Sequence, residues 1–374
     1  MNLREPLLIN GIGTVGSRIA RLLLSMGIPV HGAKYSASPD DRKTEEILHL
    51  YADFGRFPLV VALGENYSER VQKCKAMGLD VLEQYNFSRY KIIIDATEGD
   101  TTIKHMHDYK KNNQPFLVQA GTESEIVPDF VSAPRAVCEQ YNAYEKGTRQ
   151  VSCNSTFCST ALGLVLKHVA AENIVRVNLK LQRRCRDPGE KKELKANLDM
   201  KDSHHAHSVM SVLPQLHGKI FSQANTNAWE HFHHTTMLID FTRPVAVDEM
   251  KQSFRDYERC IFLEHTISGD AAHGIELLRS VSQALHVPDA DTLLPIYSMR
   301  QISPKQIEIT GYTPQRSIVA LSCVDWLWGA LDVKKNWEEA FRFTNEHVRW
   351  HGYSVTELKE AYEKALDIQV SVQR

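Results

Sequence analysis

Residues 6–38 read PLLINGIGTVGSRIARLLLSMGIPVHGAKYSAS, and this stretch decides the fold of the first part of the chain. A short apolar run is followed by a glycine turn, then by apolar residues at helical spacing, and then by a second apolar run. This order is typical of two parallel β-strands joined by an α-helix, and its length agrees with the ~30 residues that such a unit needs. The stretch therefore predicts the start of a parallel sheet.

The glycines of this stretch form a G-x-G-x-x-G pattern at Gly11, Gly13 and Gly16, directly after the first strand and at the start of the helix. Backbone amides and the helix N-terminus can hold a pyrophosphate there, so we predict a dinucleotide site. A plain tight turn is the alternative interpretation.

The end of the second strand bears on the choice of cofactor. A site selective for NAD usually carries Asp or Glu at this place, but the sequence has Lys34 followed by two hydroxyl residues. A cation beside hydroxyls suits a 2'-phosphate, so we expect NADP to be accepted as well as NAD. Alternatively, Lys34 is a solvated surface lysine.

Length and composition set the limits for the whole chain. Its 374 residues exceed the ~250–300 at which single hydrophobic cores stop growing, so two domains are expected. Lys plus Arg number 44 against 46 for Asp plus Glu, which gives no general attraction to nucleic acid or to a membrane surface. The seven cysteines include no CxxC pair, and no apolar stretch reaches the ~18 residues of a membrane helix. We therefore expect a cytoplasmic protein with reduced thiols.

The apolar pattern changes along the chain. Residues 90–100 (YKIIIDATEGD) and 114–121 (QPFLVQAG) look like further buried strands, which favours a doubly wound parallel sheet over residues 1–150. Apolar and polar residues alternate in 173–185, 235–247 and 305–314, so we expect an α+β domain over residues 151–328. Residues 329–374 show helical periodicity, broken near His351 and Gly352.

The stretch SCNSTFCSTALG (152–163) holds two cysteines, of which Cys153 is the candidate nucleophile. Cys153 follows an expected strand and precedes a helical run, Ser159–Ala171, so it should feel the positive end of the helix dipole. That position lowers the pKa of a thiol. Cys158 lies further into the helix, where burial would leave it inert. The alternative for Cys153 is a buried small apolar residue.

A reactive cysteine that follows a dinucleotide site indicates aldehyde oxidation through a thioester. This chemistry needs a base to take a proton and donors for the developing oxyanion. Histidines near Cys153 in the fold are candidates, and they occur in two clusters: His204, His205 and His207, and His231, His233 and His234. His231 and His233 share one face of an expected strand. A metal site is the competing interpretation, but no established metal motif occurs, and we expect no metal.

Arginines at 183, 184 and 186 suit the bidentate recognition of a phosphate. Consecutive residues on a strand face opposite ways, so we expect only one of Arg183 and Arg184 to reach a site.

Taken in order, several segments resemble the archaeal-type (class II) glyceraldehyde-3-phosphate dehydrogenases. They are INGIGTVGSRIA, GAKYS, VSCNST, QRRCRD, SHHAHSV, the HFH of EHFHHTTM, QRSIV and FTNEHV. They occur in the family's order and at nearly its spacings, over almost the whole chain.

The resemblance implies a Rossmann-type domain, a catalytic α+β domain with an antiparallel sheet, and C-terminal helices that return to the cofactor domain. It also implies a homotetramer that uses NADP or NAD to oxidise D-glyceraldehyde 3-phosphate with inorganic phosphate, a reaction of glycolysis. The residues carried over are Cys153 as nucleophile, His231 as base and Asn154 at the oxyanion; Ser155, Arg183, Arg184, His204 and His205 at substrate and phosphate; and Gly11, Gly13, Gly16 and Lys34 at the cofactor.

The chain departs from the family at four places. Phe157 stands where an aliphatic residue is usual, residues 320–323 replace a P-E-N segment, the third strand ends in DATEGD, and the tail beyond FTNEHV is longer than usual. These changes leave two alternatives open: a related dehydrogenase acting on another phosphorylated aldehyde or semialdehyde, and a nucleotide-binding redox sensor without turnover.

Overall fold

The computed structural model describes residues 5–33, 42–55, 59–60, 67–82, 86–97, 99–119, 127–132, 147–185, 197–230, 232–264, 271–287, 292–331 and 336–372. The chain divides into two compact units. The first comprises Met1–Phe130, Glu139–Gln150 and Ala320–Trp350, and the second comprises Val131–Cys138, Val151–Val319 and His351–Arg374. The described helices beyond residue 329 are thus shared between the two units.

The first unit contains a sheet of eight strands in the order β4-β3-β2-β1-β5-β6-β8-β7, and every neighbouring pair is parallel. The strands are β1 (Leu7–Asn10), β2 (Val30–Ala33), β3 (Leu59–Val60), β4 (Val81–Leu82), β5 (Ile93–Asp95), β6 (Phe116–Val118), β7 (Asp129–Phe130) and β8 (Thr148–Gln150). After β1 the chain passes to β2 on one side and later returns to β5 on the other. This reversal is the topological switch point of a doubly wound sheet, as the sequence predicted.

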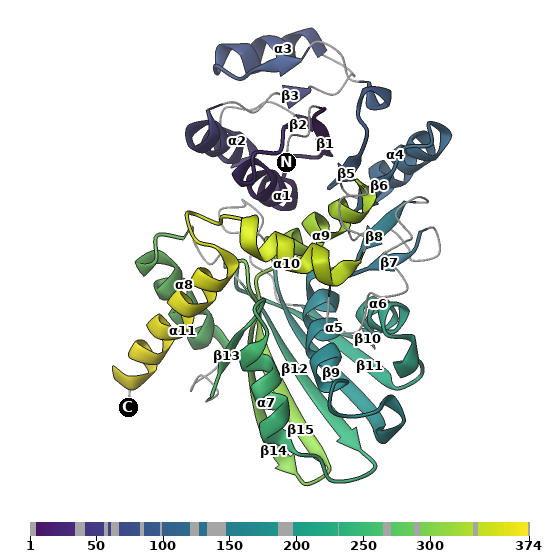
Figure 1. Ribbon diagram of the computed structural model, residues 1–374, viewed down its shortest axis with the longest axis vertical. Coiled ribbons are helices and arrows are strands. Elements are labelled where there is room, and N and C mark those ends of the chain that lie inside the picture. Colours follow the sequence, from purple (N-terminus) through teal and green to yellow (C-terminus); the bar gives the residue numbers. More distant parts are fainter. Residues whose placement is uncertain are drawn as a thin grey trace. The chain divides into compact units, whose positions relative to one another are not determined.

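Figure 1 labels the α-helices of the first unit, and the first of them illustrates how apolar residues at helical spacing form one buried face. In α1 (Thr14–Ser25) the side chains of Ile19, Leu22 and Leu23 are fully buried, and the helix ends before Gly27, which has a positive φ of 72°. The other helices of this unit are α2 (Arg42–Phe54), α3 (Tyr67–Ala76), the 3-10 helix η1 (Phe87–Arg89), α4 (Gly99–Lys111), α9 (Ala320–Ala330) and α10 (Trp337–His347).

The second unit contains a sheet of seven strands in the order β10-β11-β9-β12-β15-β14-β13. They are β9 (Ile174–Arg184), β10 (Asn197–Asp202), β11 (Ile220–Asn227), β12 (His233–Phe241), β13 (Ile261–Leu263), β14 (Ile296–Ser303) and β15 (Gln306–Thr313). The pairs β9–β11 and β13–β14 are parallel and the other neighbours are antiparallel. The expected α+β unit is confirmed, with a mixed sheet in place of a purely antiparallel one.

Helices cover one face of this second sheet, with α5 (Cys153–Val165) and α7 (Val247–Asp256) lying along its strands in Figure 1. The remaining helical elements are α6 (His204–Val212), α8 (Ala271–Ala284), α11 (Val355–Val372) and the 3-10 helices η3 (Ala171–Asn173) and η4 (Pro214–Leu216). Along β12, every second side chain is buried, beginning with His233. The side chain of His233 therefore faces the core between this sheet and its helices.

The two C-terminal helices are separated where the sequence predicted a break, at His351 and Gly352, which both have positive φ. In the second unit, α11 packs against α8 and β13, and the Tyr362 hydroxyl lies 2.6 Å from the Ser282 hydroxyl of α8. The Lys359 ammonium donates to the carbonyl of Tyr257 at 2.9 Å. The long tail thus packs within the second unit.

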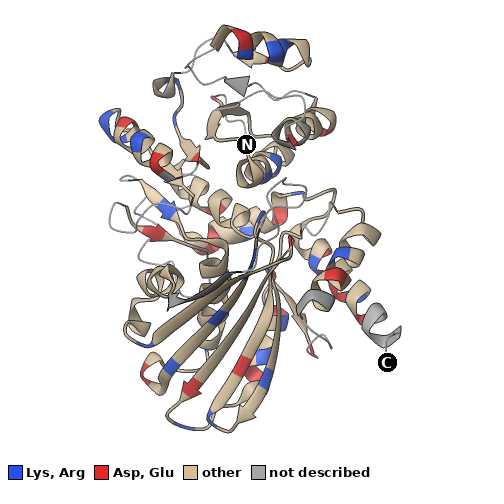
Figure 2. Cartoon of the chain, turned by 180° about the vertical axis from the view of Figure 1, so that it is seen from behind, with Lys and Arg blue, Asp and Glu red and all other residues tan. Residues whose placement is uncertain are grey.

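Acidic and basic residues are interspersed over both units in Figure 2. No helix among the described residues is long and apolar enough to cross a membrane.

Candidate active site

Cys153 is the first residue of α5, and the residue before it, Ser152, caps the helix. The Ser152 hydroxyl accepts the backbone N–H of Ser155 at 3.3 Å, which satisfies one of the free amides of the first turn. The prediction that Cys153 lies at a helix N-terminus is confirmed. The helix itself begins six residues earlier than the expected Ser159, because the serine cap starts it directly after β8.

The pKa of the Cys153 thiol is raised to about 11, because burial disfavours the thiolate. The Arg184 guanidinium and the backbone N–H of Asn154 act in the opposite direction but do not outweigh burial. The backbone N–H groups at the helix N-terminus lower this pKa as expected, but burial outweighs them and the net shift is upward. The thiol is protonated at neutral pH, so a nucleophilic role requires a base that takes its proton during attack.

Cys158 is fully buried inside α5, and burial raises the pKa of its thiol. This agrees with the expectation that Cys158 is an inert core residue. Phe157 is likewise fully buried, and its ring stacks on Tyr297 with 4.3 Å between the centroids. The departure from the family at Phe157 is thus a packing difference in the core.

Asn154 and His205 contact each other beside the nucleophile candidate. The Asn154 side-chain amide lies 3.3 Å from Nε2 of His205, and Nδ1 of His205 lies 3.0 Å from the Ser203 hydroxyl. Burial, helped by the charges of His204 and Arg183, lowers the pKa of His205 to about 3, so its ring is neutral. With Asn154 donating to Nε2, His205 carries its proton on Nδ1 and donates to Ser203.

Oδ1 of Asn154 is buried and has no hydrogen-bond partner among the described residues. The Ser155 hydroxyl, in contrast, lies 2.9 Å from the Ser152 hydroxyl and belongs to the helix cap. The structure therefore leaves Oδ1 of Asn154 without a described partner and ties the Ser155 hydroxyl to the Ser152 side chain. His204 is exposed, and its ring stacks on His205 at 4.1 Å.

His233 is a buried residue of this site that the sequence reasoning passed over in favour of His231. Nδ1 of His233 accepts the backbone N–H of Arg184 at 3.0 Å, and burial together with the Arg184 charge holds its pKa well below the ordinary value. The neutral ring therefore carries its proton on Nε2 and is a donor there. His231 lies outside the described residues. The shared strand face of the two histidines was the signal that could have indicated His233.

Arg183 and Arg184 end β9, and both charges act on the Cys153 thiol. The influence of Arg184 on the thiol pKa is larger than that of Arg183, and which of the two guanidinium groups reaches a ligand stays a prediction. Nη1 of Arg184 donates to the Glu230 carbonyl at 3.5 Å, and Nη2 of Arg183 donates to the Thr226 hydroxyl at 3.5 Å. Nε of Arg183 is buried without a partner among the described residues.

Two further donors near these arginines were not found from the sequence. Asn227 is paired with Arg184 in the sheet, and the Trp229 carbonyl accepts the backbone N–H of Cys185 at 3.0 Å. Nδ2 of Asn227 and Nε1 of Trp229 are buried and unpartnered in the described part of the chain. The sequence signal that could have indicated these two donors is their position directly before the histidines at 231–234.

In the first unit, the glycine loop joins β1 to α1. Gly11 has a φ of 95°, and a Cβ on it would lie 2.8 Å from the carbonyl carbon of Ala96. A Cβ on Gly16 would lie 2.1 Å from the Gly11 carbonyl oxygen, so both positions require glycine. Gly13 precedes the first residue of α1, and no side chain caps this helix. The backbone N–H groups of a helix N-terminus that follows a glycine turn fit a pyrophosphate. Lys34 lies outside the described residues.

Among the described residues, no group of three or more His, Cys, Asp or Glu side chains is arranged to hold a metal ion.

The chain is similar to curated proteins named glyceraldehyde-3-phosphate dehydrogenase. That of Hyperthermus butylicus is 23% identical over 352 residues, which cover 91% of this chain and 96% of the relative. That of Sulfolobus acidocaldarius is 24% identical over 357 residues, with the same coverage of both chains, and that of Aeropyrum pernix is 25% identical over 282 residues, or 74% of this chain and 75% of the relative. No family model matches the chain.

Proposed function

Because the chain belongs, as a distant member, to the archaeal glyceraldehyde-3-phosphate dehydrogenase family, we propose that it oxidises D-glyceraldehyde 3-phosphate with inorganic phosphate and NADP or NAD. The product is 1,3-bisphosphoglycerate. The observation that carries the proposal is Cys153 at the N-terminus of α5, within the field of Arg183 and Arg184 and beside Asn154.

In the first step, the sulfur of Cys153 adds to the aldehyde carbon, and a base takes the thiol proton. The raised pKa of Cys153 makes this base necessary, because little thiolate is present beforehand. We assign the base to His231. His233 is unsuited to that role while Nδ1 accepts the Arg184 N–H and Nε2 carries the proton.

The addition places a negative charge on the former carbonyl oxygen. The amide group of Asn154 has a second hydrogen besides the one directed at His205, and it would donate that hydrogen to the oxyanion. His233 would supply a further donor through Nε2. The hemithioacetal then loses a hydride and becomes a thioester on Cys153.

Inorganic phosphate cleaves the thioester and releases the acyl phosphate. Arg183, Arg184, His204 and His205 would hold the phosphate groups of the substrate and the attacking phosphate, because guanidinium groups match phosphate bidentately. Arg183 offers a buried Nε donor with no described partner.

Bound NADP or NAD would accept the hydride at its nicotinamide ring. Gly11, Gly13 and Gly16 would hold its pyrophosphate, and Lys34 would favour the 2'-phosphate of NADP. We expect a homotetramer in the cytoplasm, and the mass from light scattering would check the subunit number.

The test is NADPH and NADH formation from D-glyceraldehyde 3-phosphate with and without inorganic phosphate. Turnover that requires phosphate supports the proposal. Turnover with a different phosphorylated aldehyde or semialdehyde in an equal-concentration panel would assign the chain to a related dehydrogenase. Cofactor binding without any turnover would instead support a redox sensor that uses Cys153.

A further inference from the structure

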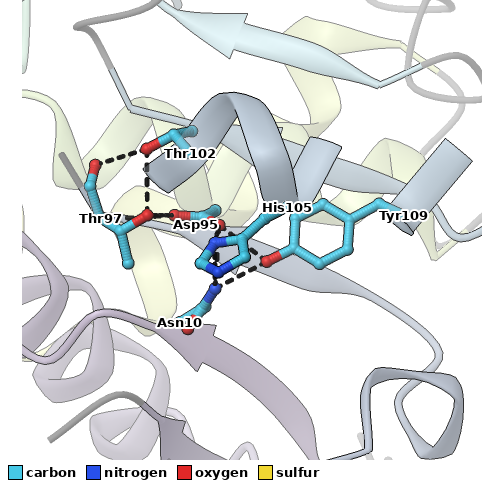
Figure 3. A network of polar contacts seen from close by, with 6 residues as sticks. All are labelled: Asn10, Asp95, Thr97, Thr102, His105 and Tyr109. Atoms are coloured by element: carbon cyan, nitrogen blue, oxygen red, sulfur yellow. Dashed lines mark hydrogen bonds and ion pairs between the residues drawn. The ribbon is translucent and has the colours of Figure 1, made fainter. Parts of the chain in front are cut away.

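A closed group of polar side chains lies at the topological switch point of the first sheet (Figure 3). Its centre is Asp95, the fully buried last residue of β5, which is paired with Asn10, the last residue of β1. One carboxylate oxygen of Asp95, Oδ2, accepts from the Asn10 amide at 2.9 Å and from the Tyr109 hydroxyl at 2.7 Å, and it lies 2.9 Å from Nδ1 of His105. The group therefore links two strands to α4.

The other oxygen of Asp95 shapes the turn that follows β5. Oδ1 accepts the backbone N–H of Thr97 at 2.8 Å and the Thr97 hydroxyl at 2.5 Å. The Thr102 hydroxyl of α4 donates to the carbonyl of the same Thr97 at 2.8 Å. The turn at residues 95–97 is thus held from both sides.

This carboxylate is ionised. Burial alone would raise the pKa of Asp95, but hydrogen bonds from His105, Thr97 and Tyr109 outweigh that effect and hold the pKa below its ordinary value. A buried carboxylate is costly unless donors compensate its charge. Each donor is therefore held in place, because moving it away from Asp95 would cost free energy.

The glycine loop rests on this turn. Gly11 directly follows Asn10, and the position that its Cβ would take lies 2.8 Å from the Ala96 carbonyl carbon and 2.9 Å from Cγ2 of Thr97. The Ala96 N–H also donates to the Asn10 carbonyl at 2.7 Å. Any shift of residues 95–97 would therefore move the backbone amides that follow Gly11.

We infer that His105 and Tyr109 are positioning residues of the dinucleotide site, which act through Asp95 to fix the turn beneath the glycine loop. The two residues are one helical turn apart on α4 and reach the same oxygen, Oδ2 of Asp95. This inference rests on the proposed function, since it assumes that the glycine loop binds NADP or NAD.

The experiment compares the wild type with His105→Leu, His105→Asn and Tyr109→Phe. The matched control is Tyr90→Phe, because Tyr90 is also a buried tyrosine of the first unit and its hydroxyl also contacts a histidine, His31, at 3.1 Å. Dissociation constants for NADPH and NADH are measured by fluorescence titration, alongside the melting temperature and the KM values for cofactor and aldehyde.

We expect His105→Leu and Tyr109→Phe to raise the cofactor Kd and KM about tenfold, which corresponds to about 1.4 kcal/mol, with the aldehyde KM unchanged. His105→Asn should restore binding to within about threefold of wild type, because an Asn amide can donate near the place of Nδ1. Tyr90→Phe should leave cofactor binding unchanged.

Unchanged cofactor binding in Tyr109→Phe and His105→Leu, with only a lower melting temperature, would show a purely structural role and overturn the inference. Equal loss of binding in Tyr90→Phe would do the same. If His105→Leu fails to fold, the cofactor Kd of Tyr109→Phe tests the inference alone. That variant removes a single oxygen and should fold. A wild type that binds neither cofactor would overturn the proposed function, and the inference with it.

Discussion

The surroundings of Asp95 and those of Cys153 differ in whether their buried polar atoms have hydrogen-bond partners. Around Asp95, none of the six side chains in Figure 3 has a buried polar atom without a partner within the described part of the chain. Beside Cys153 and at the end of β9, buried atoms of Asn154, Arg183, Asn227 and Trp229 lack partners among the described residues.

Burying a polar atom without a partner costs about 1–3 kcal/mol, so native structures contain few of them. Several in one region indicate a place that is built to bind a polar ligand. A closed cluster indicates fixed geometry. Changes near Cys153 should therefore affect activity more than stability, and changes in closed polar clusters should affect stability, or the position of what they hold.

The sharpest test of the open region is Cys153→Ser. A serine hydroxyl is a far weaker nucleophile, so we expect turnover of the aldehyde to fall by about 10⁴-fold or more while the melting temperature stays near wild type. Steady-state kinetics and thermal unfolding measure both. Cys158→Ala is the matched control on the same helix, and comparable loss of activity in that variant would contradict the choice of Cys153.

Closed polar clusters are tested by Arg149→Leu. Nε and Nη2 of Arg149 bind both oxygens of Asp129 at 2.5 and 2.7 Å, and both residues are buried. Loss of the arginine removes the opposite charge and two hydrogen bonds from a buried carboxylate, so we expect the free energy of unfolding to fall by about 3–5 kcal/mol. Arg300→Gln, which breaks an exposed pair with Glu308, should cost less than about 1 kcal/mol in denaturant titrations. A similar loss of unfolding free energy in both variants would contradict the distinction between closed buried clusters and exposed ion pairs.

The raised pKa of Cys153 gives the open region a pH signature. A thiol with a pKa of about 11 is protonated below that value, so the thiolate fraction grows as pH rises. We expect the rate of alkylation by iodoacetamide to increase about tenfold per pH unit from pH 7 to 9 in the free enzyme. A plateau already reached at pH 8 would show that the thiol has a low pKa and needs no base.

The smallest effect is expected for Arg183→Leu. Removal of one guanidinium should raise the KM for phosphate about tenfold, while the melting temperature should not fall, because a buried unpaired donor is removed with it. Arg176→Leu is the control on the same strand, since Arg176 is exposed and pairs with Asp240. A rise in the phosphate KM in the control would show a general effect of charge.

The sequence was most informative where local patterns decide the structure. Gly11 and Gly16 could be recognised because only glycine fits there: Gly11 has a positive φ, and a Cβ at either position would be too close to backbone atoms. The alternation of apolar and polar residues predicted the strand β12. The position of Cys153 near a helix start could be predicted from local residues, although the helix begins earlier than expected.

Other features depend on contacts between distant segments. The pKa of Cys153 is raised mainly by burial, which its neighbours in sequence do not reveal and which outweighs the lowering by the helix N-terminus. The role of Asp95 depends on α4, because the spacing of His105 and Tyr109 looks like that of any helix face. Asn227 lies beside Arg184 only because β11 pairs with β9, and Trp229 lies near the end of β9 because its carbonyl accepts the Cys185 N–H.

The measurement that tests the thioester route most directly is intact-protein mass spectrometry after brief incubation with D-glyceraldehyde 3-phosphate and NADP, without inorganic phosphate. We expect wild type to gain the mass of one 3-phosphoglyceroyl group, located at Cys153 by peptide mapping, and to lose it when phosphate is added. An adduct that also forms on Cys153→Ser, or no adduct alongside NADPH production, would contradict covalent catalysis by Cys153.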